Sequence, residues 1–225
     1  MKNLIAVTKI ALILLPLTLL LGQKAGKLEE QLIAQGLVNI HSLSPGILVD
    51  LKYSSTDNFL GEDTYGDLEA CFLQPEAAAK LAKAQTFLQA KYPDLSLLVY
   101  DGARPRSIQR KMWALVVGTD TQDYVANPNR GSVHNFGSAI DLTVAKLDGT
   151  PLDMGTEFDY FGELAQPRFE EKFLEQGKLT PSQMKNRIIL RTAMTEAGFQ
   201  MISIEWWHFN AVSVKTARSN YRIIE

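Results

Sequence analysis

Two of the three histidines in this sequence stand near an acidic residue, in a polar turn or at the expected end of a strand. His134 lies in the run Ser-x-His-x-x-Gly-x-Ala-x-Asp, which ends at Asp141. Imidazole nitrogen and carboxylate oxygen are zinc ligands at about 2.0–2.2 Å. The odd spacing would put residues 134 and 141 on opposite faces of an unbroken strand. A shared metal therefore requires a turn at residues 135–137, where Gly137 can adopt conformations closed to other residues.

The second candidate segment reads Glu-Trp-Trp-His and would supply a third metal ligand, His208. Three protein ligands with a fourth position open is the pattern of catalytic zinc sites, and Glu205 would be the base that takes a proton from water. Residues three apart in a regular strand face opposite ways, so joint use of Glu205 and His208 predicts a bend at Trp206 or Trp207. The tryptophans would lower the local dielectric and raise the pKa of Glu205 toward the range of a general base.

The third candidate segment, Asp-Gly-Ala-Arg-Pro, follows a short apolar run. Arg104 stands between a small residue and Pro105, which is suited to the start of a helix. A guanidinium fixed at that point could bind an oxyanion or a substrate carboxylate in bidentate fashion.

Each of these residues also has a purely structural interpretation. His134 could sit in an ordinary turn, the tryptophans could be packing residues, and Arg104 could simply form an ion pair with Asp101. His41, which precedes a turn and has no acidic neighbour, is best interpreted as structural. The coincidence of the other two histidines, each beside a carboxylate in a polar turn or at a strand end, favours a metal site.

The composition is that of a soluble globular protein. The chain has 225 residues, of which 46% are hydrophobic and 21% charged. This balance argues against a disordered chain and a polytopic membrane protein. The formal charge of −2 offers no basic excess for nucleic acid, so no nucleic-acid partner is expected. The lone Cys71 excludes an intrachain disulfide and a four-cysteine zinc site.

Residues 1–22 are predicted to be an export signal or an uncleaved membrane anchor, and 23–225 a single functional domain. A basic start at Lys2 is followed by a leucine-rich apolar run over 4–21. That run is near the minimum of about 17 residues for a spanning helix, although Lys9 and Pro16 interrupt it. The expected location is the periplasm or cell envelope, with anchoring in the inner membrane through 4–21 as the alternative.

The elements that must position these residues do not alternate regularly between helix and strand, so an α+β fold with a mostly antiparallel sheet flanked by helices is expected. Residues 118–137, rich in Gly, Asn, Asp and Ser, are expected to form a long loop. The helix that begins after Thr180, with a capping box and proline at its first position, should end at Gly198. Helices are predicted over 26–36, 75–91, 106–116 and 181–197, and strands over 37–40, 47–53, 95–100, 138–144, 199–204 and 207–212.

With these segments assembled, the sequence resembles the D-alanyl-D-alanine dipeptidases of the vancomycin-resistance type. These zinc peptidases share the fold of D,D-carboxypeptidases and of the Hedgehog signalling domain. The similarity covers most of the chain from about Ile47 to Phe209 and rests on five motifs in the family's order. The two motifs beyond the three segments above, at 53–61 and 153–159, point to the dipeptidase branch.

The resemblance implies a fold of the Hedgehog and D,D-peptidase kind and one zinc ion held by His134, Asp141 and His208. It implies Glu205 as general base and acid and Arg104 as the group that stabilises the tetrahedral intermediate. It also implies that Tyr53, Ser132 and Asp159 lie near the substrate, with Asp159 near its ammonium group. The implied reaction is zinc-dependent hydrolysis of D-alanyl-D-alanine to two D-alanines, a small-molecule substrate.

Two other functions stay open at this stage. One is a related peptidoglycan D,D-carboxypeptidase or L,D-endopeptidase with the same site in a more open cleft. The other is a non-catalytic module that binds zinc or wall peptides. The presence of both Glu205 and Arg104 argues against the module, because binding alone needs neither a base nor an oxyanion donor. An exported enzyme would meet wall fragments or dipeptide outside the cytoplasm, and the oligomeric state is left open.

Overall fold

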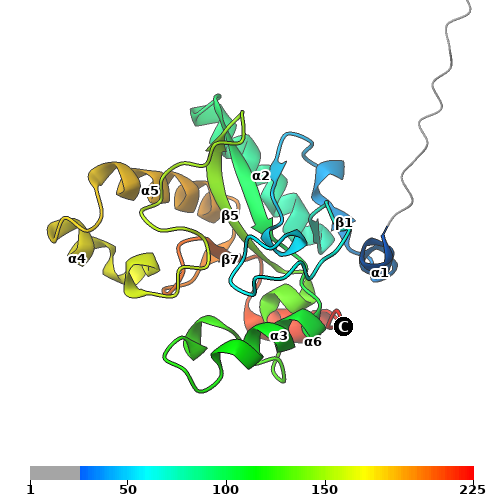
Figure 1. Ribbon diagram of the computed structural model, residues 1–225. Helices are drawn as coiled ribbons and strands as arrows, with labels where there is room; N and C mark the ends of the chain where they lie inside the picture. Colours follow the sequence, from blue (N-terminus) through cyan, green and yellow to red (C-terminus); the bar gives the residue numbers. More distant parts are fainter. Residues whose placement is uncertain (1–25) are drawn as a thin grey trace, which may run out of the picture.

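The computed structural model describes residues 26–225, so the predicted segment 1–22 lies outside the described residues. Figure 1 shows the elements along the chain. The helices are α1 (Lys27–Ala34), α2 (Pro75–Lys91), α3 (Arg106–Val116), α4 (Glu170–Glu175), α5 (Pro181–Glu196) and α6 (Val214–Asn220). The strands are β1 (Val38–Asn39), β2 (Leu48–Val49), β3 (Phe72–Leu73), β4 (Leu95–Asp101), β5 (Ala139–Lys146), β6 (Gln200–Met201) and β7 (His208–Asn210).

A five-stranded sheet in the order β2-β4-β5-β7-β6 forms the centre of the fold. Only β2 and β4 run parallel among its pairs, and the other three pairings are antiparallel. Strands β1 and β3 form a separate antiparallel pair. The predicted α+β class with a mostly antiparallel sheet is therefore confirmed.

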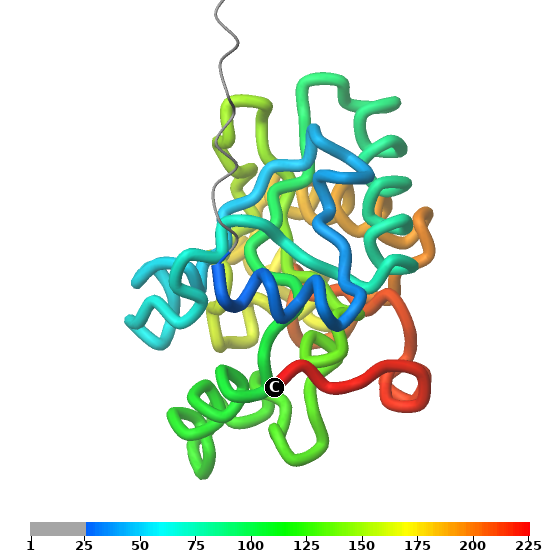
Figure 2. The backbone as a smooth tube through the Cα atoms, turned by 90° about the vertical axis from the view of Figure 1, so that its right-hand side faces the viewer, coloured from blue at the N-terminus to red at the C-terminus, as the bar shows by residue number. Residues whose placement is uncertain are grey.

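Helices α2 and α5 pack against each other and against the sheet, α2 on β4 and α5 on β5 and β6. Figure 2 shows both helices on one side of the strands, with the loop that follows β2 on the other side. Alternate residues of β5 divide between the two faces. Ile140, Leu142 and Val144 join the main core with these helices, so Asp141 and Thr143 point to the opposite face.

The sequence features that start and end α2 and α5 act as predicted. Pro75 and Pro181 occupy first-turn positions, and Thr180 forms a capping box with Gln183. Gly198 follows α5 with a φ of +91°, a left-handed conformation that suits glycine. These signals depend on local geometry, which is why the sequence reveals them.

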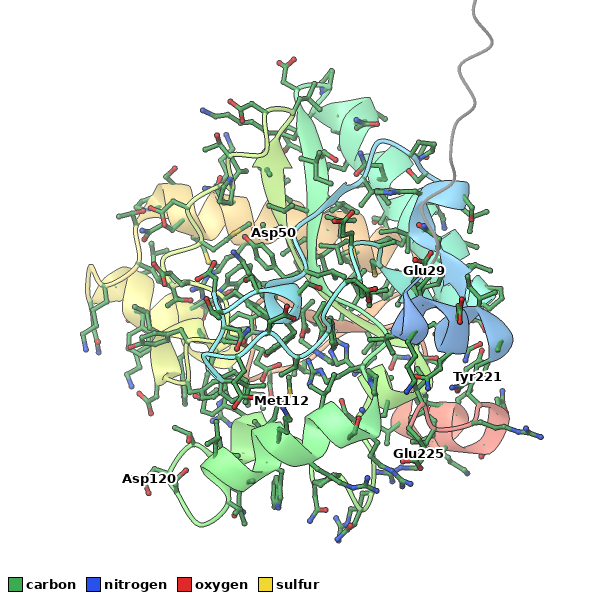
Figure 3. The ribbon with its side chains drawn as sticks, turned by 45° about the vertical axis from the view of Figure 1, so that its right-hand side comes forward. Glu29, Asp50, Met112, Asp120, Tyr221 and Glu225 are labelled. Atoms are coloured by element: carbon green, nitrogen blue, oxygen red, sulfur yellow. The ribbon has the colours of Figure 1, made fainter. Side chains whose placement is uncertain are left out.

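Helix α3 lies with α6 at one end of the molecule (Figure 1). Met112 of α3 is buried and lies on the side of the helix that faces the rest of the protein, whereas Asp120 lies at the outer end of the following loop (Figure 3). Tyr221 and Glu225, near α6, lie at the same end of the molecule. This arrangement covers the end of the sheet where β4 stops and β7 begins.

Several predicted strands are shorter than expected. The strand predicted over 47–53 is limited to Leu48–Val49, because the backbone turns into a 3₁₀ helix at Lys52–Ser54 that buries Tyr53. The strand predicted over 199–204 is limited to Gln200–Met201, an edge pair with β7. The loop predicted over 118–137 holds two 3₁₀ helices, Gln122–Tyr124 and Val133–Phe136. Over the described residues, no helix has the length and apolar character needed to cross a membrane.

Candidate metal centre

His134, Asp141 and His208 come from three separate elements and meet on the face of the sheet opposite α2 and α5. Asp141 and His208 are direct partners across β5 and β7, so their side chains lie on the same face. His134 comes from the 3₁₀ helix Val133–Phe136. The sequence-predicted ligands are therefore brought together, from positions up to 74 residues apart.

The turn required between His134 and Asp141 is present. Gly137 has a φ of +64° and ends the 3₁₀ helix, and a Cβ at this position would overlap the Leu37 side chain. Ser132 caps the start of the same helix: its hydroxyl accepts from the His134 N–H, and its own N–H donates to Asn135 Oδ1 at 2.8 Å. The predicted substrate residue Ser132 thus has a structural role and also lines the site cavity.

The three candidate ligand atoms lie close enough together to bind one metal ion. His208 Nδ1 lies 2.9 Å from Asp141 Oδ1, and His134 Nε2 lies 3.1 Å from His208 Nδ1 and 3.3 Å from Asp141 Oδ1. Ligands bound tetrahedrally at about 2.0–2.1 Å would lie roughly 3.3 Å from one another. The residues present therefore fit a zinc ion.

On each histidine ring, one nitrogen forms a hydrogen bond away from the cluster, which leaves the other nitrogen free to bind a metal. His134 Nδ1 lies 2.8 Å from the Gly102 carbonyl, and His208 Nε2 lies 3.1 Å from Asn210 Oδ1. Each acceptor calls for a proton on that nitrogen, so the lone pairs of His134 Nε2 and His208 Nδ1 face the cluster.

Glu205 lies beside the cluster, with Oε2 3.9 Å from His208 Nδ1. The backbone bends at Trp206 and Trp207 before β7 begins at His208, as the predicted convergence required. Both tryptophans are buried, and Trp207 also packs edge-on to Phe158. Burial raises the pKa of Glu205 to about 8, with His208 opposing the shift.

Arg104 is a buried cation whose position is fixed mainly by Asp101. Its Nε donates to Asp101 Oδ2 at 2.8 Å, its Nη2 bonds the same oxygen, and its Nη1 donates to Gln109 Oε1 at 3.0 Å. A longer bond of 3.4 Å joins Nη2 to Asp141 Oδ2. Of the five guanidinium hydrogens, one on Nη1 has no partner among the described residues. The ion pair that was the structural alternative is real, and it holds Arg104 beside the cluster.

Asp101 was considered in the sequence analysis only as an ion-pair partner of Arg104, and the structure makes it a candidate functional residue. It is fully buried and accepts further bonds from Tyr65 Oη at 2.6 Å and the Gly102 N–H at 2.8 Å. A shift of register between Val99 and Asp101 places Asp101 opposite Asp141. Only glycine fits at 102, because a Cβ there would collide with Cys71 Sγ. The sequence signal was the Asp-Gly pair before Arg104, but nothing in it indicated the shift of register.

Tyr53 and Asp159 meet at another wall of the site. Tyr53 Oη donates to Asp159 Oδ2 at 2.7 Å, and the Arg104 guanidinium lies 5.4 Å from the centre of the Tyr53 ring. Burial raises the pKa of Asp159 to about 8, although the Tyr53 bond opposes the shift. Among the described residues, Asp159 is the one non-glycine position with a positive φ, +58°, a strained conformation that often marks functional sites.

These residues surround a cavity of about 270 Å³. It is lined by the three candidate ligands, by Glu205 and Arg104, and by all three predicted substrate residues. His41 lies apart from the site, in the 3₁₀ helix Ile40–Ser42, where its Nε2 lies 2.8 Å from the Ile47 carbonyl oxygen. The site could therefore hold a metal ion beside a base, a fixed cation and a small ligand.

Comparisons with known proteins agree on one family. A family model described as "D-ala-D-ala dipeptidase" matches residues 33–223. A D-alanyl-D-alanine dipeptidase of Escherichia coli (strain K12) is 35% identical over 173 residues, covering 77% of this chain and 83% of that protein. The Enterococcus faecium protein of the same name is 30% identical over 191 residues, covering 77% and 90% of the two chains. That of Enterococcus faecalis (strain ATCC 700802 / V583) is 28% identical over 196 residues, covering 79% and 92%.

Proposed function

The chain belongs to the D-ala-D-ala dipeptidase family of peptidases, and from this premise we propose that it hydrolyses D-alanyl-D-alanine to two D-alanines with one zinc ion. The observation that carries the proposal is the convergence of three zinc-compatible ligand atoms beside Glu205 and Arg104. His134, Asp141 and His208 would hold the ion. When bound, zinc would supply Lewis acidity, which lowers the pKa of water and polarises a carbonyl group.

Glu205 is the general base and then the general acid of this proposal. Its carboxylate takes a proton from the attacking water and later gives it to the departing amine. Its raised pKa of about 8 suits a group that must both take and release a proton near neutral pH. The surrounding tryptophans keep bulk water away from this exchange.

Arg104 stabilises the negative charge that develops on the carbonyl oxygen. The unpartnered Nη1 hydrogen and the weak bond to Asp141 leave it able to donate to that oxygen. The remaining donors are engaged by Asp101 and Gln109, so the guanidinium is held in place before substrate arrives. Losing one such donor typically costs about 2.7–4 kcal/mol of barrier, or 10²–10³ in rate.

Tyr53, Asp159 and Ser132 position the substrate. The Asp159 carboxylate binds the substrate ammonium, and a hydrogen bond from Tyr53 Oη fixes the position of that carboxylate. Ser132 lies at the cavity wall beside His134. A cavity of about 270 Å³ is slightly smaller than the usual range of ligand pockets, about 300–1,000 Å³, and suits a dipeptide of two small residues.

The alternatives from the sequence have less support. A carboxypeptidase or endopeptidase acting on wall peptides needs room for a longer chain, and the small cavity favours the dipeptide. A non-catalytic module would not need a base and an oxyanion donor beside the metal. The exported location proposed from residues 1–22 rests on the sequence alone.

The proposed function is tested by incubating the metal-free protein with D-Ala-D-Ala, with and without added zinc, and measuring free D-alanine. We expect two D-alanines per dipeptide with zinc and none with a chelator. Hydrolysis that is equally fast with and without zinc would contradict the metal dependence. Hydrolysis of a blocked tripeptide in preference to the dipeptide would favour the carboxypeptidase.

A further inference from the structure

A second, larger cavity of about 830 Å³ adjoins the site cavity and has no part in the chemistry above. Tyr100 of β4 and Thr143 of β5 line it on the sheet, and the segments 56–59 and 151–159 line it on either side. Of the residues described, Phe59 and Asp159 alone line both cavities. These two residues therefore border both cavities, and we refer to them as the wall.

The second cavity continues along β5 from the candidate metal centre. Asp141 and Thr143 are two residues apart on this strand, so their side chains point to the same face. The Thr143 side chain is 1% exposed, and its hydroxyl has no hydrogen-bond partner within the described part of the chain. Since buried hydroxyls are normally bonded, the unpaired Thr143 hydroxyl marks a polar position in the wall of this cavity.

Phe59 is the residue of the wall that can be replaced without disturbing the site. Its ring is only partly buried and packs edge-on against Tyr53, with centroids 6.3 Å apart, and against Phe161 at 4.9 Å. Tyr53 is fully buried and bonded to Asp159, so its loss would disturb the site itself. A smaller residue at position 59 would join the two cavities and leave the Tyr53–Asp159 bond in place.

We infer that Phe59 sets the length of the substrate, by closing the site cavity beside Asp159 and excluding residues that precede the scissile pair. This inference rests on the proposed function, in which Asp159 receives the ammonium of the dipeptide. Any residue attached to that nitrogen must pass the wall formed by Phe59 and Asp159. Beyond the wall, the second cavity offers space along β5, where Thr143 lines it.

The test compares D-Ala-D-Ala with Gly-D-Ala-D-Ala in the zinc-loaded wild type and in Phe59→Ala, measuring free D-alanine. We expect the ratio of kcat/KM for the tripeptide to that for the dipeptide to rise at least tenfold in Phe59→Ala. Phe161→Ala is the matched control, because Phe161 is also a partly buried phenylalanine but lines the site cavity only. Its ratio should stay within about twofold of the wild type.

An unchanged kcat/KM ratio in folded Phe59→Ala would overturn the inference. An equal rise of this ratio in Phe161→Ala would overturn it as well. So would a wild type that already cleaves the tripeptide as fast as the dipeptide. Phe59→Val keeps more of the packing and should give an intermediate ratio if the alanine variant does not fold. Binding of the tripeptide is measured separately by calorimetry in Glu205→Gln and Glu205→Gln/Phe59→Ala, and only the double variant should bind it. A wild type that leaves the dipeptide intact would refute the proposed function. The binding comparison would even then show whether Phe59 excludes the tripeptide.

Discussion

Asp101 and Asp141 face each other across β4 and β5, and the two carboxylates divide their partners between them. Asp141 lies beside the free nitrogens of the two histidines, while Asp101 holds the guanidinium of Arg104. A single long bond of 3.4 Å links Arg104 to Asp141. One acid thus serves the candidate metal centre and the other fixes the cation beside it.

Replacing Asp101 with asparagine should impair catalysis without removing the metal. The variant loses the charge that orients Arg104, and a displaced oxyanion donor is expected to lower kcat about 10²-fold. Zinc content should stay at the wild-type level, because Asp101 is not among the candidate ligands. Asp50→Asn, which alters an exposed acid paired with Lys52, should leave kcat unchanged. Loss of zinc from Asp101→Asn would contradict this division of roles.

Replacing Glu205 with glutamine should leave zinc bound and abolish turnover. General acid–base catalysis contributes typically 10²–10⁴ in rate, so kcat should fall by at least 10². His208→Ala, in contrast, should lose both zinc and activity. Steady-state kinetics and metal analysis of the two variants separate the roles, and near-normal activity of Glu205→Gln would show that another group is the base.

Asn210 should matter for metal affinity although it does not reach the metal centre. Its side-chain oxygen accepts from His208 Nε2 and thereby orients the ring. Loss of such a partner typically weakens metal binding 10–100-fold, which is the result expected for Asn210→Ala in a chelator competition assay. Asn210→Asp keeps an acceptor and should retain affinity within about threefold. Equal zinc affinities for the wild type, Asn210→Ala and Asn210→Asp would show that Asn210 does not orient His208.

Asp159 should make the metal-free protein less stable as the pH rises. Its pKa is raised from 3.8 in the reference state to about 8 by burial, so the folded protein binds more protons than the unfolded chain between these values. The stability from protonated Asp159 is fully present below about pH 4 and is lost as the pH rises through about 8.

Asp159→Asn cannot ionise at this position. The Tm of the variant minus that of the wild type should therefore be larger at pH 9 than at pH 5. Each kcal/mol corresponds to about 2–4 °C for a chain of this size. Thermal unfolding of the metal-free proteins at the two pH values provides the measurement. A Tm difference that does not change with pH would mean that Asp159 does not titrate in this way.

The sequence was sufficient for the features that depend on local pattern. Helices α2, α3 and α5 were predicted because their proline starts and apolar spacing are encoded within single segments. The meeting of His134, Asp141 and His208 was predicted because histidines are few and each of the two stands near an acid. The turn at Gly137 and the bend at Trp206 and Trp207 followed from the requirement that these residues converge.

Features that depend on how distant segments pack were not predictable. The register shift that turns Asp101 toward Asp141, and the Asn210 contact behind His208, require the completed sheet. The short strands β2 and β6 at the sheet edges were overestimated, since apolar runs there serve the core without full pairing. The wall between the two cavities joins segments about 100 residues apart, and no local signal marks it.

The central claim is that three side chains hold one zinc ion, and metal stoichiometry tests it most directly. The purified protein, equilibrated with zinc and then desalted, should contain one zinc per chain by elemental analysis. His134→Ala, Asp141→Ala and His208→Ala should each retain well under half of that amount while remaining folded. Full zinc content in any one of these variants, or none in the wild type, would contradict the account.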